Sequence, residues 1–334
     1  MSDLLLKSIA EVAQNGYENM QCNLVYYTDV NTSFMIIDNQ EIWMRKNNLM
    51  NDYSEFLYGE ERVRDIIHGS LKEKLDRVLS RLNVSENYFQ ESFEKMISPL
   101  KKQSYILCMT KEQLSEENDG RLSMWRGYGD VGGVAFVFNK RVLIETFASI
   151  AMEPSKSIFA PGIFLFPVLY GEHEIIENDI NLLFEEVIGY SEEYINCFTK
   201  DELLNQVIIN LCFAMMIQKH SGFMEEREIR FWFSILNPNG LEEGLTKIVI
   251  KNQCLGEIHQ RVAAINLDKI FQDSEHLAGV SWSTLIDRII VGPMQREKAE
   301  ALREILFDKV RAKDADFNID KIVLSSIPFR KSLR

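Results

Sequence analysis

The sequence lacks the motifs that hold most structural metal ions and disulfide frameworks. None of its five cysteines stands in a CxxC pair, and none of its five histidines stands in an HExxH or HxH motif. An odd number of scattered cysteines predicts reduced thiols, as in a cytosolic protein. Isolated histidines are usually surface or core residues rather than ligands. We therefore expect no zinc site and a cytoplasmic protein.

Long apolar runs, an amino-terminal leader and an excess of basic residues are also missing. No stretch approaches eighteen uninterrupted apolar residues, and the Met-Ser-Asp start has no basic segment followed by an apolar one. We therefore expect neither a membrane-spanning helix nor a secretion signal. The 37 Lys and Arg residues against 50 Asp and Glu residues give a net charge of −13. This balance argues against a broad nucleic-acid-binding face but still allows a local basic groove.

What is present is the composition of a globular protein, with 46% hydrophobic and 26% charged residues among 334. Helical and strand-like segments do not alternate as in βαβ units, and neither a repeat nor a linker divides the chain. The sequence therefore predicts a single elaborated α+β domain over residues 1–334. Helical spacing of apolar residues predicts a helical insertion at about 55–100 within it.

The remaining elements follow from the same periodicities. Residues 55–100 are expected to hold two helices, the second beginning near Ser85, with Pro99 closing the block. Residues 34–45 are expected to form two short strands or a helix followed by a strand, and residues 111–121 a charged loop that could move. Further helices are expected at 3–15, 141–149, 180–198, 200–219 and 295–312, and strands at 23–28, 104–110, 134–138, 163–170, 246–250, 286–292 and 322–325. The helix at 200–219 is apolar almost all round, so it should be buried.

The segment from Phe223 to Phe233 runs from charged residues into aromatic ones and is expected to be a strand. Because side chains alternate along a strand, Glu226, Glu228 and Arg230 would share one face. The alternative is an edge strand on which Glu228 and Arg230 form an ordinary surface ion pair.

A glycine-rich segment lies at residues 122–134 and contains Trp125, Arg126 and Tyr128. Its glycines do not form a GxGxxG motif, and no helix is expected after them, so a Rossmann or P-loop site is excluded. Two interpretations stay open. The glycines let a ligand approach the backbone, or they form a turn covered by core aromatics.

In order along the chain, these features resemble the bacterial family of unknown function DUF2971. The resemblance is carried by five motifs and covers nearly the whole chain. They are Tyr26-Tyr27, Asn51-Asp52 with Glu55, Met124-Trp125-Arg126-Gly127-Tyr128 with Gly133-Val134, Phe223 with Glu226, Glu228 and Arg230, and Ile286-Asp287-Arg288-Ile289-Ile290-Val291-Gly292-Pro293. The sequence departs from the family at Phe223, where Trp is common, and at Arg45, where the second strand often ends in Ser.

The resemblance implies an ADP-ribosyltransferase-like fold of split antiparallel β-sheets surrounded by helices, with a cleft for NAD. In such transferases a strand-edge Glu stabilises the oxocarbenium-like transition state, and a Glu two residues earlier orients the acceptor. The resemblance thus assigns the catalytic role to Glu228 and the acceptor-orienting role to Glu226. Transferases of this type need no metal.

Other contacts to NAD are assigned by chemistry. The nicotinamide ring should stack on an aromatic side chain, and the pyrophosphate should bind a guanidinium. The aromatic candidates are Tyr27, Trp125 and Tyr128, and the guanidinium candidates are Arg45, Arg126 and Arg230. Asn51 and Asp52 either bind a ribose or cap the helix that follows, and Trp125 is either a ligand contact or a core residue.

The function implied is cleavage of the nicotinamide–ribose bond of NAD and transfer of ADP-ribose to a protein, a nucleic acid or water. By analogy, such an enzyme acts as a toxin or anti-phage effector and is kept inactive by an inhibitory or sensor partner protein. One alternative is a catalytically silent nucleotide-binding or sensor protein. Another is a nuclease in which Glu226, Glu228, Asp52 and Glu55 bind magnesium.

Overall fold

The computed structural model of the chain describes residues 22–46, 54–129, 132–151, 163–234, 246–253, 256–268 and 279–328. The helix expected at 3–15 and the residues Asn51 and Asp52 lie outside these ranges, as does the side chain of Glu55. The chain divides into two compact units. The first contains residues 1–19, 46–105 and 165–224, and the second contains residues 20–45, 106–164 and 225–334.

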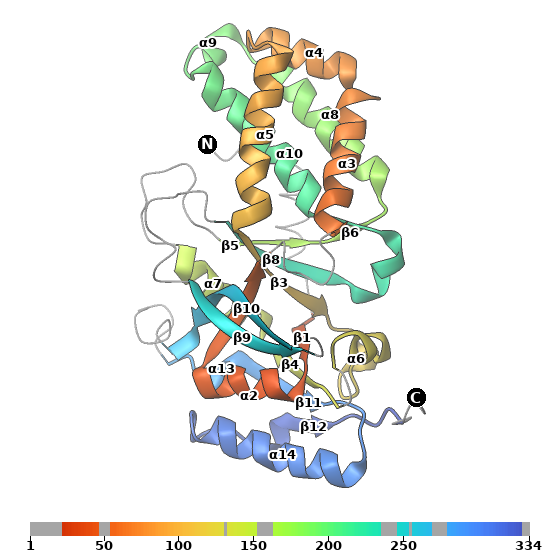
Figure 1. Cartoon of the computed structure of the whole chain (residues 1–334), viewed down its shortest axis with the longest axis vertical. Helices are drawn as coiled ribbons and strands as arrows, with labels where there is room; N and C mark the ends of the chain where they lie inside the picture. The colour runs from red at the N-terminus through yellow and green to blue at the C-terminus, as the bar shows by residue number, and fades with distance from the viewer. Residues whose placement is uncertain are drawn as a thin grey trace. The chain divides into compact units, whose positions relative to one another are not determined.

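The first unit is built around one buried helix, α10 (Lys200–Met216). Thr199 caps its amino terminus in a reciprocal pair with Glu202, which fixes where the helix begins. Its neighbours are α3 (Ser54–His68), α5 (Glu86–Gln103) and α8 (His173–Gly189) (Figure 1). A Cβ at Gly59 of α3 would lie 1.9 Å from the carbonyl oxygen of Met215, so only glycine permits this approach. The prediction of a buried helix here is confirmed.

The helical region at 55–100 is confirmed, but it contains three helices rather than two. A short turn after His68 separates α3 from α4 (Lys72–Arg81). The next helix, α5, begins at Glu86, where the Ser85 side chain accepts from the backbone N–H of Tyr88. Pro99 does not end it, because α5 continues to Gln103. The rest of the unit includes α9 (Glu192–Ile195) and the parallel strands β6 (Leu169–Tyr170) and β7 (Gln218–Lys219). The segments expected as one helix at 180–198 and one strand at 163–170 are therefore each divided.

The second unit is built on a mixed, largely antiparallel sheet, which gives the chain the predicted α+β class. Its strand order is β12-β11-β4-β1-β3-β2-β10-β9, and β8 also pairs with β3. The strands are β1 (Leu24–Thr28), β2 (Glu41–Lys46), β3 (Ser104–Lys111), β4 (Val134–Phe138), β8 (Glu228–Ser234), β9 (Thr246–Gln253), β10 (Gly256–Asn266), β11 (Ile286–Val291) and β12 (Ile322–Leu324). β5 (Ile163–Pro167) precedes β6 in the chain. The pair β11–β12 is parallel. β4 is buried along its whole length.

Helices flank this sheet. Residues 34–37 belong to α2 (Val30–Asn39), so the helix-then-strand alternative for residues 34–45 is confirmed. The Asp29 carboxylate caps α2 by accepting from the N–H of Thr32 at 2.8 Å. α14 (Arg296–Arg311) contacts α2, β11 and β12 through an apolar stripe (Figure 1). Other helices of the unit include α6 (Leu122–Tyr128), α7 (Lys140–Ala151) and α13 (Trp282–Leu285). Among the described residues, no helix combines the length and apolar character needed to span a bilayer.

Candidate functional site

The acidic segment does not form the continuous strand that its alternation predicts. Glu226 ends the 3₁₀ helix η3 (Ser221–Glu226), and β8 begins only at Glu228. Arg227 between them has a φ of 45°, in the left-handed region that non-glycine residues rarely adopt. The alternation of strand side chains therefore does not extend from Glu228 back to Glu226. The expectation that Glu226 shares a strand face with Glu228 and Arg230 is wrong, whereas Glu228 and Arg230 do lie on one strand, two residues apart and in contact.

Glu228 and Arg230 form a buried ion pair. The Arg230 Nε donates to Glu228 Oε1 at 2.7 Å, and each residue is only 3% exposed. Ile229, Phe231 and Trp232 are buried as well, so β8 is covered on both faces. The edge-strand alternative, with a solvated surface pair, is also wrong. A buried pair of this kind holds its partners in place, because either charge alone would be left without water.

The backbone around Glu226 is fixed by three successive carbonyl groups. The Glu225 carbonyl accepts from Arg121 Nη1, the Glu226 carbonyl accepts from the Thr110 hydroxyl, and the Arg227 carbonyl accepts from the N–H of Lys111 at 3.1 Å. The bonds from Thr110 and Lys111 join the start of β8 to the end of β3, and the bond from Arg121 joins it to the start of α6.

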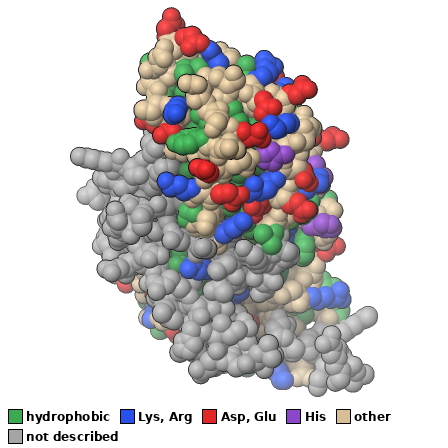
Figure 2. Space-filling model, turned by 45° about the horizontal axis from the view of Figure 1, so that its top comes forward, with side chains coloured by type: hydrophobic (Ala, Val, Ile, Leu, Met, Phe, Trp, Pro, Cys, Tyr) green, Lys and Arg blue, Asp and Glu red, His purple; other side chains and the backbone are tan. Residues whose placement is uncertain are grey.

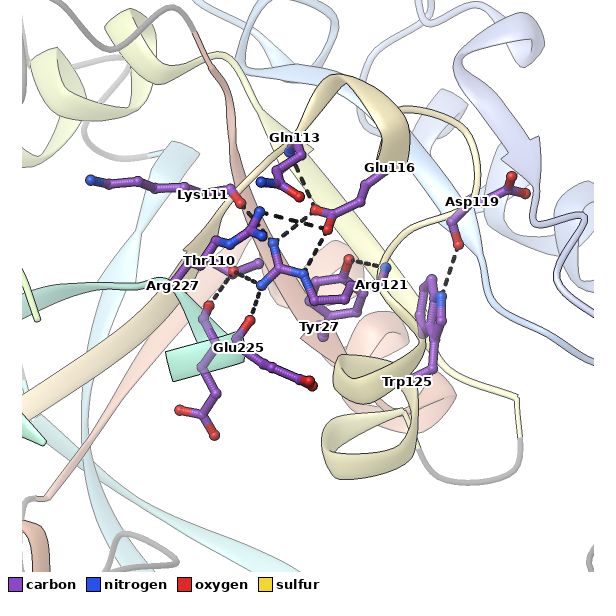
Figure 3. Close-up of polar contacts among 11 residues, drawn as sticks. Tyr27, Thr110, Lys111, Gln113, Glu116, Asp119, Arg121, Trp125, Glu225 and Arg227 are labelled. Atoms are coloured by element: carbon purple, nitrogen blue, oxygen red, sulfur yellow. Dashed lines mark hydrogen bonds and ion pairs between the residues drawn. The ribbon is translucent and has the colours of Figure 1, made fainter. Parts of the chain in front are cut away.

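Arg121 lies at the centre of this arrangement (Figure 3). Its guanidinium forms a two-pronged ion pair with Glu116, with Nε at 2.7 Å from Oε1 and Nη2 at 2.8 Å from Oε2. It also donates to the Thr110 hydroxyl and to the Lys111 carbonyl, each at 3.2 Å. The Arg227 Nη1 lies 3.9 Å from the same Glu116 carboxylate. One guanidinium therefore holds together a loop, a strand end and the carbonyl of Glu225.

The charged loop at 111–121 was expected to be able to move, but in this structure it is tied down at several points. Arg288 on β11 donates from Nε to the Glu117 carbonyl at 2.6 Å and pairs with the Glu112 carboxylate. Burial raises the pKa of Glu112, and Arg288 acts in the opposite direction. The Asp119 carbonyl accepts from Trp125 Nε1 at 2.9 Å. No role was predicted for Arg121, and Arg288 was named only as part of a motif. The opposite charges of the loop do not specify which partners they bind.

The first part of the glycine-rich segment, Leu122–Tyr128, is the helix α6, and its aromatic residue Trp125 belongs to the core. Trp125 is 4% exposed, and its ring meets that of Tyr27 edge-on, with centroids 4.7 Å apart. The Tyr27 hydroxyl accepts from the N–H of Arg121 at 2.8 Å, and burial raises the pKa of Tyr27 to about 12. Both rings lie in a core cluster, so the core alternative for Trp125 fits its surroundings.

Two glycines of the resembling motifs, Gly133 and Gly292, lie where a side chain would not fit. The N–H of Gly292 donates to the Gly133 carbonyl at 2.8 Å. A Cβ at Gly292 would lie 2.9 Å from the Trp125 ring, and one at Gly133 would lie 2.4 Å from the Cα of Gly129. Motifs that are far apart in the sequence therefore pack closely together. Their backbones can approach this closely because glycine has no side chain.

Tyr128 and Glu226 bring two predicted residues together at the surface. The Tyr128 hydroxyl donates to Glu226 Oε1 at 2.9 Å, and Tyr128 is 40% exposed. Glu226 is half-buried, and both residues have further contacts. Arg126 on the same helix is exposed. This is the part of the candidate site that a ligand can reach without unfolding.

The other candidates are half-buried, buried or outside the described ranges. Arg45 is half-buried on β2, opposite Val262 of β10, and its charge opposes the effect of burial, which raises the pKa of Tyr26. Asp52 is not described. Glu228, Tyr27 and Trp125 are buried, which favours a supporting role over direct contact with NAD.

The described residues contain no group of three or more His, Cys, Asp or Glu side chains placed to hold a metal ion. Among the described residues, Cys22, Cys108, Cys197 and Cys212 are free cysteines.

Comparison with known proteins connects this geometry to one family. No curated protein and no solved structure matches the chain. The model of DUF2971, described as a protein of unknown function, matches residues 124–231, from α6 to β8. The matched segment begins at Met124 and ends at Phe231, and thus includes Tyr128, Glu226, Glu228 and Arg230. The resemblance to DUF2971 drawn from the sequence is thereby confirmed by the match over residues 124–231.

Proposed function

We propose that this protein is an ADP-ribosyltransferase that cleaves the nicotinamide–ribose bond of NAD and transfers ADP-ribose to a macromolecular acceptor. The observation that carries the proposal is the hydrogen bond of 2.9 Å between Tyr128 and Glu226. It sets an aromatic ring beside a carboxylate that solvent reaches, on a backbone fixed by Arg121 and Thr110. A fixed carboxylate beside an aromatic surface suits a substrate that carries a flat ring on a ribose.

In this proposal Glu226 takes the transition-state role that the resemblance assigned to Glu228. The bond between ribose C1′ and the nicotinamide nitrogen breaks, and nicotinamide leaves with the bonding electrons. Positive charge develops on the ribose, and a nearby carboxylate stabilises it. An acceptor oxygen or nitrogen then attacks C1′, and its proton passes to the Glu226 carboxylate. Glu228 is too deeply buried for this position, and with Arg230 it holds the strand that follows.

Other residues supply binding. Tyr128, exposed at the end of α6, offers its face to the nicotinamide ring. Arg126, also exposed on α6, offers a guanidinium to the pyrophosphate. Tyr27 of β1 holds α6 in place through its edge-on contact with Trp125 of that helix. The proposal includes an ADP-ribosyltransferase-like fold, in which the β-sheet is split. The pairing of β8 with β3, outside the main strand order, supports this fold.

The acceptor in the proposal is a protein or a nucleic acid, and the setting is that of a toxin or anti-phage effector controlled by a partner protein. The test is to incubate the purified chain with NAD labelled on its adenosine half and with cell extract. Labelled macromolecules with equimolar free nicotinamide support the transferase. Nuclease and protease treatment of the labelled product then identifies the acceptor class.

Two outcomes contradict the proposal. Saturable NAD binding without nicotinamide release, in the presence of extracts from several sources, indicates a nucleotide-binding or sensor protein. Degradation of nucleic acid that stops on addition of EDTA indicates a magnesium-dependent nuclease. Glu228 is paired with Arg230, so it would have to leave that pair to bind a metal ion.

A further inference from the structure

The first unit contains a cluster of basic and hydroxyl side chains that includes none of the residues of the proposed transferase. It consists of Tyr58 and Arg62 on α3, His173 at the start of α8 and His220 just after β7. Figure 2 shows histidine side chains at the surface beside Lys and Arg. Nothing in the proposed transfer reaction uses this cluster.

Arg62 makes no ion pair within the described part of the chain. Its Nε donates to His173 Nδ1 at 3.3 Å, so this N–H group bonds to an imidazole nitrogen and not to a carboxylate. The carboxylates next to these residues in the sequence are exposed, and none of them forms an ion pair with Arg62; they are Glu61, Asp65, Glu172 and Glu174.

The hydrogen bonds assign the protons on both histidines. Because His173 Nδ1 accepts from Arg62, the His173 proton is on Nε2, which lies 3.4 Å from the Tyr58 hydroxyl. Burial, and then the charge of Arg62, lower the pKa of His173, which keeps this ring neutral near pH 7. His220 Nδ1 accepts from the N–H of Gly222 at 3.1 Å, so its proton is also on Nε2.

The cluster consequently presents donors without acceptors. The terminal N–H groups of Arg62, the hydroxyl hydrogen of Tyr58 and the Nε2–H of His220 meet no acceptor within the described residues. The Tyr58 ring lies 6.0 Å from the His220 ring and 6.3 Å from the His173 ring, centroid to centroid. Groups this close can all reach one small ligand. That ligand must accept several hydrogen bonds and carry negative charge.

We propose that Tyr58, Arg62, His173 and His220 form a binding site for the phosphate group of a small molecule. A guanidinium binds two phosphate oxygens at once, which leaves the third oxygen for the tyrosine hydroxyl or the imidazole. His173 orients Arg62 by accepting from its Nε, so that its terminal N–H groups point to the ligand. The site is independent of the proposed transferase and can be tested without NAD.

The test follows the ring signals of ¹³C-labelled histidines in the full chain during titration with sodium phosphate. Sodium chloride at matched ionic strength is the reference, and a nucleoside 5′-monophosphate forms a second arm. The site predicts saturable shifts of the His173 and His220 signals with phosphate, the monophosphate or both. Tighter binding of the monophosphate identifies a phosphate ester as the natural ligand, and equal binding identifies the free ion.

Arg62→Gln should weaken binding at least tenfold, since a hydrogen bond to a charged group contributes about 1.5–3 kcal/mol and 1.4 kcal/mol is tenfold. Tyr58→Phe, which removes only a hydroxyl, should weaken it less. Arg296→Gln, an exposed arginine on α14, is the matched control and should bind as wild type does. Shifts that do not saturate, that appear equally with chloride, or that persist unchanged in both Arg62→Gln and Tyr58→Phe overturn the proposal.

Discussion

Arg230 and Glu228 lie two residues apart at the start of β8 and form an ion pair of 2.7 Å, with both side chains less than 5% exposed. Charges removed from water this completely are retained only when each compensates the other. The pair therefore fixes the first residues of β8, directly after the unusual backbone at Arg227. This in turn helps to fix the position of Glu226, which precedes Arg227.

Glu228→Gln should destabilise the protein by about 3 kcal/mol, because it removes the carboxylate charge that pairs with the buried Arg230 guanidinium at 2.7 Å. Urea unfolding followed by circular dichroism measures this loss. Glu225→Gln is the control, since that side chain is exposed, and its stability should match wild type within about 0.5 kcal/mol. Equal stability of Glu228→Gln and wild type would mean that the ion pair does not form.

Arg121→Lys should loosen the loop at 111–121 without unfolding the sheet, because lysine cannot reproduce the two-pronged contact with Glu116. Hydrogen exchange measured by mass spectrometry should become faster in peptides containing Lys111, whose N–H bonds to the Arg227 carbonyl. An increase of at least tenfold corresponds to a loss of about 1.4 kcal/mol in local stability. Arg126→Lys on the exposed face of α6 is the control. Unchanged exchange in Arg121→Lys would show that the loop is held by other contacts.

Gly120→Ala and Gly127→Ala should change stability in opposite directions. Gly120 has a φ of 68°, and its added Cβ would lie 2.7 Å from the Trp125 ring, so we expect a loss of about 2 kcal/mol or more. Gly127 lies within α6, and nothing is within 4 Å of its added Cβ, so alanine should stabilise the helix by about 0.5–1 kcal/mol. Thermal unfolding of the two variants checks both signs. A stabilising Gly120→Ala contradicts the packing of the loop on Trp125.

The raised pKa of Tyr27 gives the protein a specific loss of stability at alkaline pH. Below about pH 10 the tyrosine is neutral in both the folded and unfolded chains, so this group causes no pH dependence there. Between pH 10 and its folded pKa of about 12, the unfolded chain ionises first, and stability falls by up to about 2.7 kcal/mol.

Urea unfolding at pH 8 and pH 11 should therefore show a smaller decrease for Tyr27→Phe than for wild type. At pH 8 the variant should be slightly less stable, because it loses the hydrogen bond from the N–H of Arg121. An identical pH dependence in the two proteins contradicts the burial of this hydroxyl.

The regular elements of the fold were largely predictable, because their signals are local. Ser85 marks the start of α5, and the apolar run at 134–138 is the buried strand β4. Apolar character on all sides predicted the burial of α10. The break between α3 and α4 was missed, because the apolar period continues across it and only the turn after His68 separates the helices.

The candidate site was only partly predictable, because its geometry depends on contacts between distant residues. The positive φ of Arg227 has no signature in the sequence, since arginine rarely adopts it, and it breaks the alternation from which a common face was inferred. The bonds from Arg121 to Thr110, Lys111 and Glu225 arise only once β3 and β8 pair. A pattern of charges could not show whether Glu228 and Arg230 were exposed or buried.

The most direct test of the account compares nicotinamide release from NAD by wild type, Glu226→Gln and Glu225→Gln. The variants carry the same change at adjacent positions, but only Glu226 accepts from the Tyr128 hydroxyl. Release is followed by liquid chromatography with cell extract as acceptor, after circular dichroism has established that all three proteins fold. The account predicts release by wild type and Glu225→Gln, and a rate at least about 100-fold lower for Glu226→Gln, the usual cost of losing a transition-state contact. Equal rates for all three proteins, or no release by wild type, contradict it.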